Sequence, residues 1–133
     1  LAPLDRPASD FVAVAETLLG APYLWGGKSS LGIDCSGLVQ LSLLASGVQA
    51  PRDSDMQAAG LGDALTPGTV LRRGDLVFWK GHVGMMRDAD TLLHANGTHM
   101  LVSSEPLALV RERNIAAGAG DITGFRRLPF YVA

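Results

Sequence analysis

The stretch "WGGKSSLGIDCSGL", residues 25–38, contains the only cysteine of the 133-residue chain and opens the segment around which the fold is expected to form. From Asp34 onward, leucines and Val39 recur at helical spacing, with Asp34 as the expected N-cap and Gly47 as the expected stop. This predicted helix is apolar on most sides, which is typical of a central helix packed against the rest of a domain. Cys35 therefore falls in the first turn of a central helix.

The composition excludes several classes of protein. With 47% hydrophobic and 18% charged residues, 133 residues can build one core, so residues 1–133 are predicted to form a single domain. The net charge of -2 lacks the excess of Lys and Arg that nucleic acid or anionic lipid would require. No apolar run approaches the roughly 18 residues of a membrane span. A lone cysteine has no intramolecular disulfide partner.

The N-terminus, "LAPLDRPASD", has neither an initiator Met nor the basic-then-apolar layout of a secretory signal. We expect residues 1–8 to be a linker cut from a longer protein. The preceding portion would then carry a targeting signal or a second domain.

Helical signals occupy the first half of the chain. Residues 11–19 form a predicted amphipathic helix capped by Ser9, and a short helix capped by Ser54 follows the turn in residues 50–60. Between the first of these helices and the cysteine helix, residues 21–32 are too rich in Gly and Ser for regular structure and indicate a loop.

The second half changes to short apolar runs separated by Gly, Asp and Asn-Gly. These runs predict antiparallel strands at residues 76–79, 82–86, 91–94, 99–102 and 122–128. Asn96-Gly97 is a hairpin signal, and residues 112–121 are expected to form a surface loop. Helices followed by strands indicate an α+β domain, with the cysteine helix packed on an antiparallel sheet of four to six strands.

Cys35 admits two interpretations. A thiol becomes a nucleophile when a helix N-terminus or an imidazolium lowers its pKa from roughly 8.5, and the same helix N-terminus holds an oxyanion. The first turn of the predicted helix supplies that setting. The alternative is a small buried side chain, since free cysteines are often packing residues.

All three histidines lie in the strand-rich half. A three-residue loop at Arg87 to Ala89 would place His82 directly opposite His94, whereas a two-residue loop would send His94 to the other face of the sheet. By the same arithmetic, a two-residue turn at Asn96-Gly97 would pair His94 with His99. One face of the sheet is then expected to carry all three imidazoles.

Two chemistries fit this set. A Cys-His pair oriented by a third polar group uses Cys35, His82 and His94 in those roles. A zinc hydrolase with three histidine ligands would also use His99, but it leaves Cys35 unexplained and lacks the compact His spacing of helical metal sites.

Five blocks, "PYLWGGKSSLGIDCSGLVQ", "PRDSDMQ", "RRGDLVFW", "HVGMM" and "LLHAN", together resemble the NlpC/P60 cysteine peptidases, which cleave peptidoglycan stem peptides. The resemblance covers roughly residues 9–128 and implies a papain-like α+β fold. It implies that Cys35 is the nucleophile, His82 the general base and His94 the orienting residue. Tyr23 matches a tyrosine that lines the site and contributes to the oxyanion hole.

The resemblance also implies substrate contacts. Asp34 and Ser36 match residues that bind the amino group of an N-terminal L-Ala in members acting on free stem peptides. Arg52 and Asp53 would contact a carboxylate or amine of the substrate, although an ion pair that organises their loop is an equal alternative. Trp25 would form a pocket wall, with core packing as its alternative. His99 has no role in the family pattern.

The implied reaction is hydrolysis of the amide between the γ-carboxyl of D-glutamate and meso-diaminopimelate or L-lysine, with no cofactor and no metal. The implied partner is a stem peptide or muropeptide fragment, and an upstream SH3-like domain is expected in the full-length protein. Periplasm or cell envelope fits an enzyme of the intact wall, and cytoplasm fits recycling of fragments. A module that binds cell-wall peptides without cutting them, or a redox-sensing thiol domain, remains an alternative function.

Overall fold

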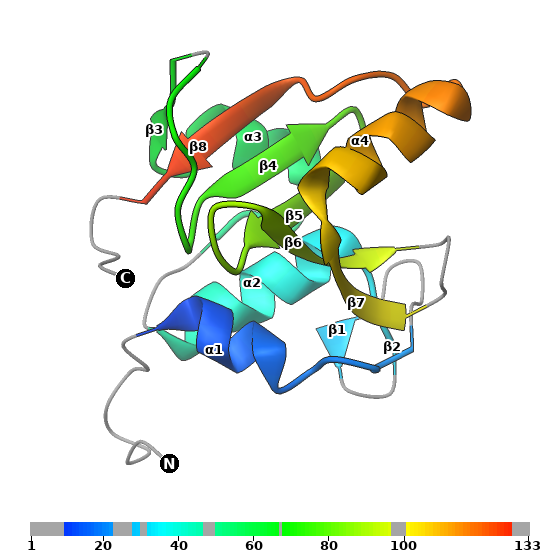
Figure 1. Ribbon diagram of the computed structural model, residues 1–133. Helices are drawn as coiled ribbons and strands as arrows, with labels where there is room; N and C mark the ends of the chain where they lie inside the picture. Colours follow the sequence, from blue (N-terminus) through cyan, green and yellow to red (C-terminus); the bar gives the residue numbers. More distant parts are fainter. Residues whose placement is uncertain are drawn as a thin grey trace.

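A six-stranded antiparallel sheet with strand order β3-β8-β4-β5-β6-β7 organises the molecule (Figure 1). The computed structural model describes residues 10–22, 28–29, 32–46, 50–66, 68–96 and 101–128. The main strands are β3 (Asp63–Ala64), β4 (Leu76–Trp79), β5 (His82–Met86), β6 (Thr91–Asn96), β7 (Leu101–Pro106) and β8 (Gly124–Arg127). The helices are α1 (Phe11–Glu16), α2 (Cys35–Ala45), α3 (Ser54–Gly60) and α4 (Leu107–Ala116). The predicted α+β class and antiparallel sheet are confirmed.

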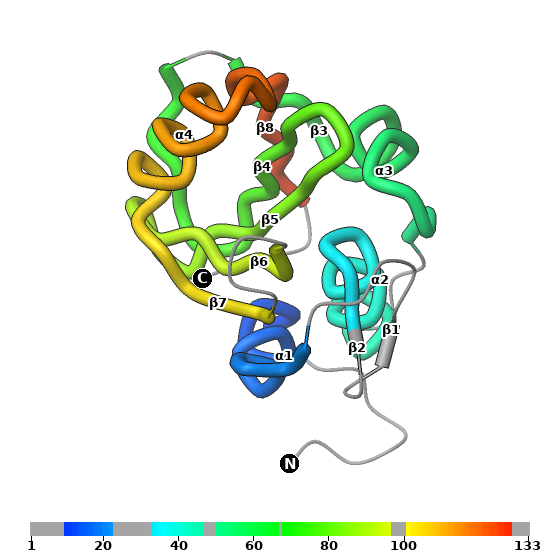
Figure 2. Tube along the Cα trace, turned by 90° about the vertical axis from the view of Figure 1, so that its right-hand side faces the viewer, coloured from blue at the N-terminus to red at the C-terminus, as the bar shows by residue number. Residues whose placement is uncertain are grey.

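Helices cover both faces of this sheet (Figure 2). Along β4, Leu76 and Phe78 join the core that includes α1 and α2, whereas Val77 and Trp79 join a second cluster with Val110 of α4. Successive strand residues point to opposite faces, so a strand covered on both sides is apolar throughout. This explains the uninterrupted run "LVFW".

Helix α2 begins as the sequence predicts. The Asp34 carboxylate accepts a hydrogen bond of 2.7 Å from the backbone N–H of Gly37, which satisfies one of the unpaired donors of the first turn. Leu38 and Leu43 are fully buried against α1 and the sheet. The C-cap is Ser46, and the expected stop at Gly47 lies outside the described residues.

The other two predicted caps are wrong by one residue. Asp10 caps α1, because its carboxylate accepts hydrogen bonds from the backbone of Val12 and Ala13, and Ser9 lies outside the described residues. Asp53 is the N-cap of α3, so Ser54 is the first helical residue and not the cap.

Two segments expected to be loops contain regular structure. The predicted loop at 112–121 overlaps α4, which continues to Ala116. The hydrophobic residues of this helix recur only weakly at helical spacing, and packing of Leu107 and Val110 against the sheet stabilises it. The expected loop at 21–32 contains β1 (Lys28–Ser29), which pairs with β2 (Gly32–Ile33). Tertiary packing and strand pairing outweigh local sequence preference in both cases.

The β5–β6 hairpin has the predicted odd-length loop in a different register. Met86 pairs with Leu92, and the Arg87 N–H donates to the Thr91 carbonyl over 2.8 Å, which leaves a three-residue loop beginning at Asp88. The Asp88 carboxylate accepts hydrogen bonds from the backbone N–H groups of Asp90 and Thr91 and thereby selects the position of the loop. The predicted loop at Arg87 to Ala89, with His82 directly opposite His94, is therefore wrong.

The β6–β7 pairing is also shifted from the prediction. His94 pairs with Ser103 and Asn96 with Leu101, so the predicted two-residue turn and the His94–His99 pair are wrong. Strand β7 begins at Leu101, and His99 lies outside the described residues.

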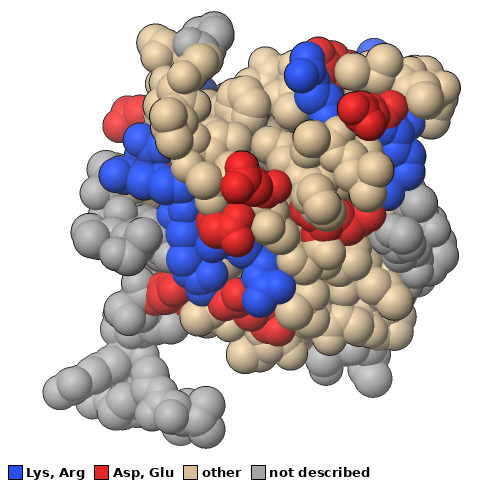
Figure 3. All heavy atoms as spheres, viewed as in Figure 1, with Lys and Arg blue, Asp and Glu red and all other residues tan. Residues whose placement is uncertain are grey.

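Ion pairs tie α1 to the segments around the hairpin. Arg73 bonds both Asp10 and Glu16, and Arg87 bonds Glu16. On the face shown in Figure 3, Lys and Arg are interspersed with Asp and Glu, which agrees with the balanced composition. Among the described residues, no helix is long and apolar enough to cross a bilayer.

Gly84→Ala is predicted to destabilise the fold by about 1–3 kcal/mol through overpacking. A Cβ at Gly84 would lie 2.7 Å from Leu92 Cδ1 and 3.1 Å from His94 Cβ, in a fully buried part of the sheet. The control is Gly124→Ala in β8, where a Cβ meets no atom of the described residues within 4 Å. Urea unfolding should show the loss only for Gly84→Ala, and equal midpoints for both variants would contradict this account.

Candidate active site

Cys35 lies where the N-terminus of α2 meets the first residues of β5. Its Sγ atom is 4.0 Å from the carbonyl oxygen of Gly81 and also faces the backbone N–H of Val83. These two residues flank His82 on both sides. The structure thus brings the cysteine and the first histidine to the same place, although they are 47 positions apart in sequence.

The pKa of Cys35 is raised from its ordinary value. Burial of the side chain is the main cause, and the negative charge of Asp34 adds to it. Backbone N–H groups of Val83, Ser36 and Cys35 oppose the shift because they favour the thiolate. The sequence prediction of a lowered pKa is therefore wrong, since burial outweighs the helix N-terminus, and the resting side chain is a neutral thiol.

His82 and His94 are hydrogen-bonded neighbours. His82 Nε2 lies 2.8 Å from His94 Nδ1, and the two ring centroids are 5.0 Å apart. Both residues share the α4-facing side of the sheet with Met86 and Leu92, because strand residues two apart face the same way. The prediction that the two imidazoles are neighbours on one face is confirmed, through a diagonal and not a directly opposed pair.

The pKa of His82 is lowered to about 3. Burial is the main cause, followed by the proximity of His94 and of the Arg113 guanidinium from α4. At neutral pH the imidazole is therefore uncharged. Within the described residues no hydrogen bond joins Cys35 to His82, whose Nε2 is occupied by His94, so Nδ1 is the nitrogen left to accept a proton.

Glu105 and Arg113 complete this cluster, and sequence reasoning missed both. Glu105 Oε2 lies 2.8 Å from His94 Nε2, and Arg113 donates two hydrogen bonds of 2.8 and 3.0 Å to the two oxygens of Glu105. The sequence did contain a signal: in "LVSSEP", Glu105 stands two positions after Ser103, so the two residues face the same side of an extended strand. It was overlooked because the strand was predicted to end at Val102.

Asp34, Ser36 and Arg52 form a second polar group beside Cys35. The two terminal nitrogens of Arg52 each lie 3.0 Å from an oxygen of Asp34, and one of them also donates to Ser36 Oγ over 2.9 Å. The ion-pair interpretation of Arg52 is observed, with Asp34 at the start of α2 as its partner. Asp53 stands at the N-cap of α3 without a side-chain cap bond.

Gln57 is a buried support that the sequence did not single out. Its side-chain amide donates to the carbonyl oxygens of Ser36 and Pro51, and the residue is 0% exposed. These bonds fasten the start of α2 to the loop before α3. Tyr23 and Trp25, the other predicted pocket residues, lie outside the described residues.

The three-histidine zinc hypothesis receives no geometric support. His82 Nε2 and His94 Nδ1 point at each other at hydrogen-bonding distance, so these two atoms are engaged with each other. No group of three or more His, Cys, Asp or Glu side chains arranged for a metal occurs in the part of the chain that the structure describes.

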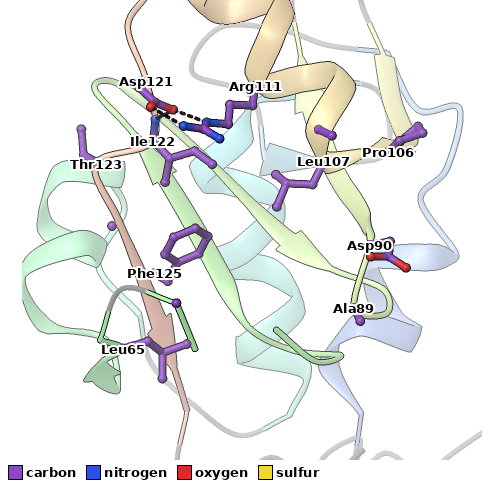
Figure 4. A pocket seen from close by; sticks show the side chains of 13 residues that line it. Leu65, Ala89, Asp90, Pro106, Leu107, Arg111, Asp121, Ile122, Thr123 and Phe125 are labelled. Atoms are coloured by element: carbon purple, nitrogen blue, oxygen red, sulfur yellow. Dashed lines mark hydrogen bonds and ion pairs between the residues drawn. The ribbon is translucent and has the colours of Figure 1, made fainter. Parts of the chain in front are cut away.

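Two cavities flank α4. A small one of about 130 Å³ is lined in part by His82, His94 and Arg113. A larger one of about 690 Å³ lies beside α4 and β8, where the Arg111–Asp121 ion pair and Phe125 form part of its wall (Figure 4). The lining residues of the larger cavity do not include Cys35 or either histidine, so it is separate from the candidate active site.

Comparison with known proteins identifies the family. The model of the NlpC/P60 family matches residues 20–116, a segment that contains Cys35, His82, His94 and Glu105. The chain belongs to the NlpC/P60 family. The resemblance that the five sequence blocks indicate is thereby confirmed.

Three similar proteins, all from bacteria, illustrate the match. The chain is 39% identical over 100 residues to a γ-D-glutamyl-L-lysine dipeptidyl-peptidase of Bacillus subtilis, covering 68% of this chain and 33% of the relative. A solved NlpC/P60 family protein from Bacillus cereus superposes with a TM-score of 0.75 at 31% identity, over 93% of this chain and 41% of that one. The peptidoglycan hydrolase RipB from Mycobacterium tuberculosis gives a TM-score of 0.67 at 32% identity, over 73% of this chain and 56% of RipB. The chain spans about a third of the length of the Bacillus and Lysinibacillus dipeptidyl-peptidases that it matches.

The low pKa of His82 predicts a specific loss of stability in acid. In the unfolded chain this imidazole takes up a proton near its ordinary pKa of 6.5, whereas in the folded protein it does so only near 3. Between these values the unfolded state binds more protons, so the free energy of unfolding falls as pH falls, by up to about 1.4 kcal/mol per pH unit from this group.

His82→Gln removes this titration. Urea unfolding of both proteins between pH 8 and 4 should show a shallower decline for the variant, while their difference stays constant above pH 7.5. Parallel curves over the whole range would contradict a half-buried His82 that is neutral in the folded protein.

Proposed function

We propose that this chain is the catalytic domain of a cysteine peptidase that hydrolyses the bond between γ-D-glutamate and the diamino acid of peptidoglycan stem peptides. The observation that carries the proposal is the contact of Cys35 Sγ with the backbone beside His82, whose ring is in turn bonded to His94. The activity for which the Bacillus subtilis relative is named, that of a γ-D-glutamyl-L-lysine dipeptidyl-peptidase, supports the bond type.

The reaction begins from a neutral thiol and a neutral imidazole. Nδ1 of His82 takes the proton of Cys35 as sulfur attacks the carbonyl carbon of the D-glutamyl γ-amide, and the carbonyl π electrons move to oxygen. An uncharged resting pair agrees with the raised pKa of Cys35 and the lowered pKa of His82. The hydrogen bond between these two groups forms as substrate binds, as is common for catalytic pairs.

The remaining steps return the enzyme to this state. The C–N bond breaks as His82 gives its proton to the leaving amine of the diamino acid, which leaves an acyl-enzyme on Cys35. His82 then takes a proton from water, whose oxygen attacks the acyl carbon, and sulfur leaves and regains a proton. Backbone N–H groups at the start of α2, together with the hydroxyl of Tyr23, stabilise the oxyanion.

Substrate recognition is assigned to the residues around Cys35. Asp34 and Ser36 bind the amino group of the N-terminal L-Ala, and Arg52 acts by holding the Asp34 carboxylate in place. Trp25, and Asp53 next to Arg52 in sequence, are proposed to contribute further contacts to the substrate. No cofactor takes part in this scheme.

The full-length protein would add determinants beyond this chain. An upstream SH3-like domain is proposed to close one end of the substrate groove. A stem peptide released from the wall would place the reaction in the cytoplasm, whereas intact wall would place it in the periplasm or cell envelope. The substrate range therefore decides between the two compartments.

Cys35→Ala is predicted to lower hydrolysis by at least about 10³-fold while changing the free energy of unfolding by less than about 1 kcal/mol. The substrates are L-Ala-γ-D-Glu-meso-diaminopimelate, the matching L-lysine peptide, and both peptides carrying muramic acid on L-Ala. Release of the free diamino acid is followed by chromatography.

Each pattern of cleavage has a distinct meaning. Cleavage of the free peptides alone indicates a dipeptidyl-peptidase that recognises the L-Ala amine, and cleavage of both kinds indicates a wall endopeptidase. Binding measured by calorimetry without turnover by the unmutated chain would favour the peptide-binding module and overturn the enzyme proposal. Activity that survives Cys35→Ala would overturn the mechanism.

A further inference from the structure

We propose that Glu105, held by Arg113, is a positioning residue that keeps a proton on His94 Nε2 and thereby makes His82 Nδ1 the atom that accepts the proton of Cys35. This inference rests on the proposed function. It adds two side chains to the set of Cys35, His82 and His94: the carboxylate of Glu105 from β7 and the guanidinium of Arg113 from α4.

The geometry forms one continuous chain of hydrogen bonds. Arg113 donates to both oxygens of Glu105, Glu105 Oε2 lies 2.8 Å from His94 Nε2, and His94 Nδ1 lies 2.8 Å from His82 Nε2. His94 is 1% exposed and Glu105 8% exposed, so solvent competes little for these bonds. A buried network of this kind must be satisfied throughout, which restricts the proton positions that it allows.

Only one arrangement of protons satisfies every contact between neutral imidazoles. An ionised carboxylate only accepts, so His94 Nε2 must carry the hydrogen that faces Glu105. Nδ1 of a neutral His94 is then an acceptor, and His82 Nε2 must carry the hydrogen that faces it. His82 Nδ1 is left with a lone pair, which is the form that a general base requires.

In the proposed arrangement, Arg113 disfavours a cationic His94. A bidentate guanidinium already balances the charge of Glu105, so the carboxylate orients the ring without drawing a second proton onto it. The positive charge of Arg113 also opposes protonation of His82, whose pKa is lowered in part by it. The pair therefore sets the tautomer while keeping the base uncharged.

Asn96 is a further neighbour of His94 Nε2 and does not alter this assignment. Its side-chain nitrogen is 3.4 Å away from His94 Nε2, whereas it lies 2.8 Å from Ser103 Oγ. Of its two hydrogens, one is donated to Ser103 Oγ, and the carbonyl oxygen of Leu101, 3.4 Å away, is an acceptor for the other. Glu105, at 2.8 Å, remains the closer partner of His94 Nε2.

The test combines kinetics with a readout that needs no substrate. Glu105→Gln should lower kcat by roughly 10–100-fold, the range known for removal of a partner of a metal-ligating histidine, with little change in KM. Glu105→Asp retains a carboxylate and should recover part of the loss. The control is Asp121→Asn, which removes the charge of another Arg-paired carboxylate, the partner of Arg111, and should leave kcat unchanged.

The tautomers are read by NMR of histidine-labelled protein through two-bond ¹H–¹⁵N correlations. In the unmutated chain His82 and His94 should both be neutral with the hydrogen on Nε2, and Glu105→Gln should introduce the Nδ1–H form of at least one ring. An Nδ1–H tautomer of His94 in the unmutated chain, or unchanged tautomers and kcat in a folded Glu105→Gln variant, would overturn the inference. The predicted tautomers in a chain that cleaves no stem peptide would support Glu105 as a positioning residue and count against the proposed function alone.

Discussion

Burial of the first turn of α2 against the start of β5 is the contact on which the rest of the site depends. It places the Cys35 thiol between the backbone of Gly81 and Val83, and it requires every polar group of that turn to find a partner inside the protein. The Asp34 carboxylate, the Arg52 guanidinium and the Gln57 amide supply those partners. The residue that caps α2, Asp34, is therefore also the sequence neighbour of the candidate nucleophile.

The same burial changes the electrostatic character of the chemistry. A helix N-terminus by itself favours a thiolate, but in this protein desolvation dominates and raises the pKa of Cys35. Desolvation also lowers the pKa of His82. Both groups rest uncharged, so charge separation would arise only during the reaction, in a dry environment where fixed hydrogen bonds are most effective.

The two faces of the sheet carry different kinds of residue. The side covered by α1 and α2 is apolar, whereas the side facing α4 carries His82, His94 and Glu105 among Met86, Leu92 and Val110. Strand alternation makes this division possible, because neighbouring residues of β5 and β6 serve opposite faces. Helix α4 closes the polar part of its face with Arg113, so the helix that covers the second core also completes the hydrogen-bond network.

The sequence by itself determined the α+β class, the cysteine at the capped start of a central helix, the main antiparallel strands and the family, because these follow from local periodicity, capping chemistry and short motifs. It did not determine the hairpin registers, which depend on an Asp88 loop and on pairing between distant strands. It also missed Glu105, Arg113 and Gln57, and it gave the wrong direction for the pKa of Cys35. Only the tertiary structure decided these points, because burial and contacts between residues far apart in the chain have no local pattern.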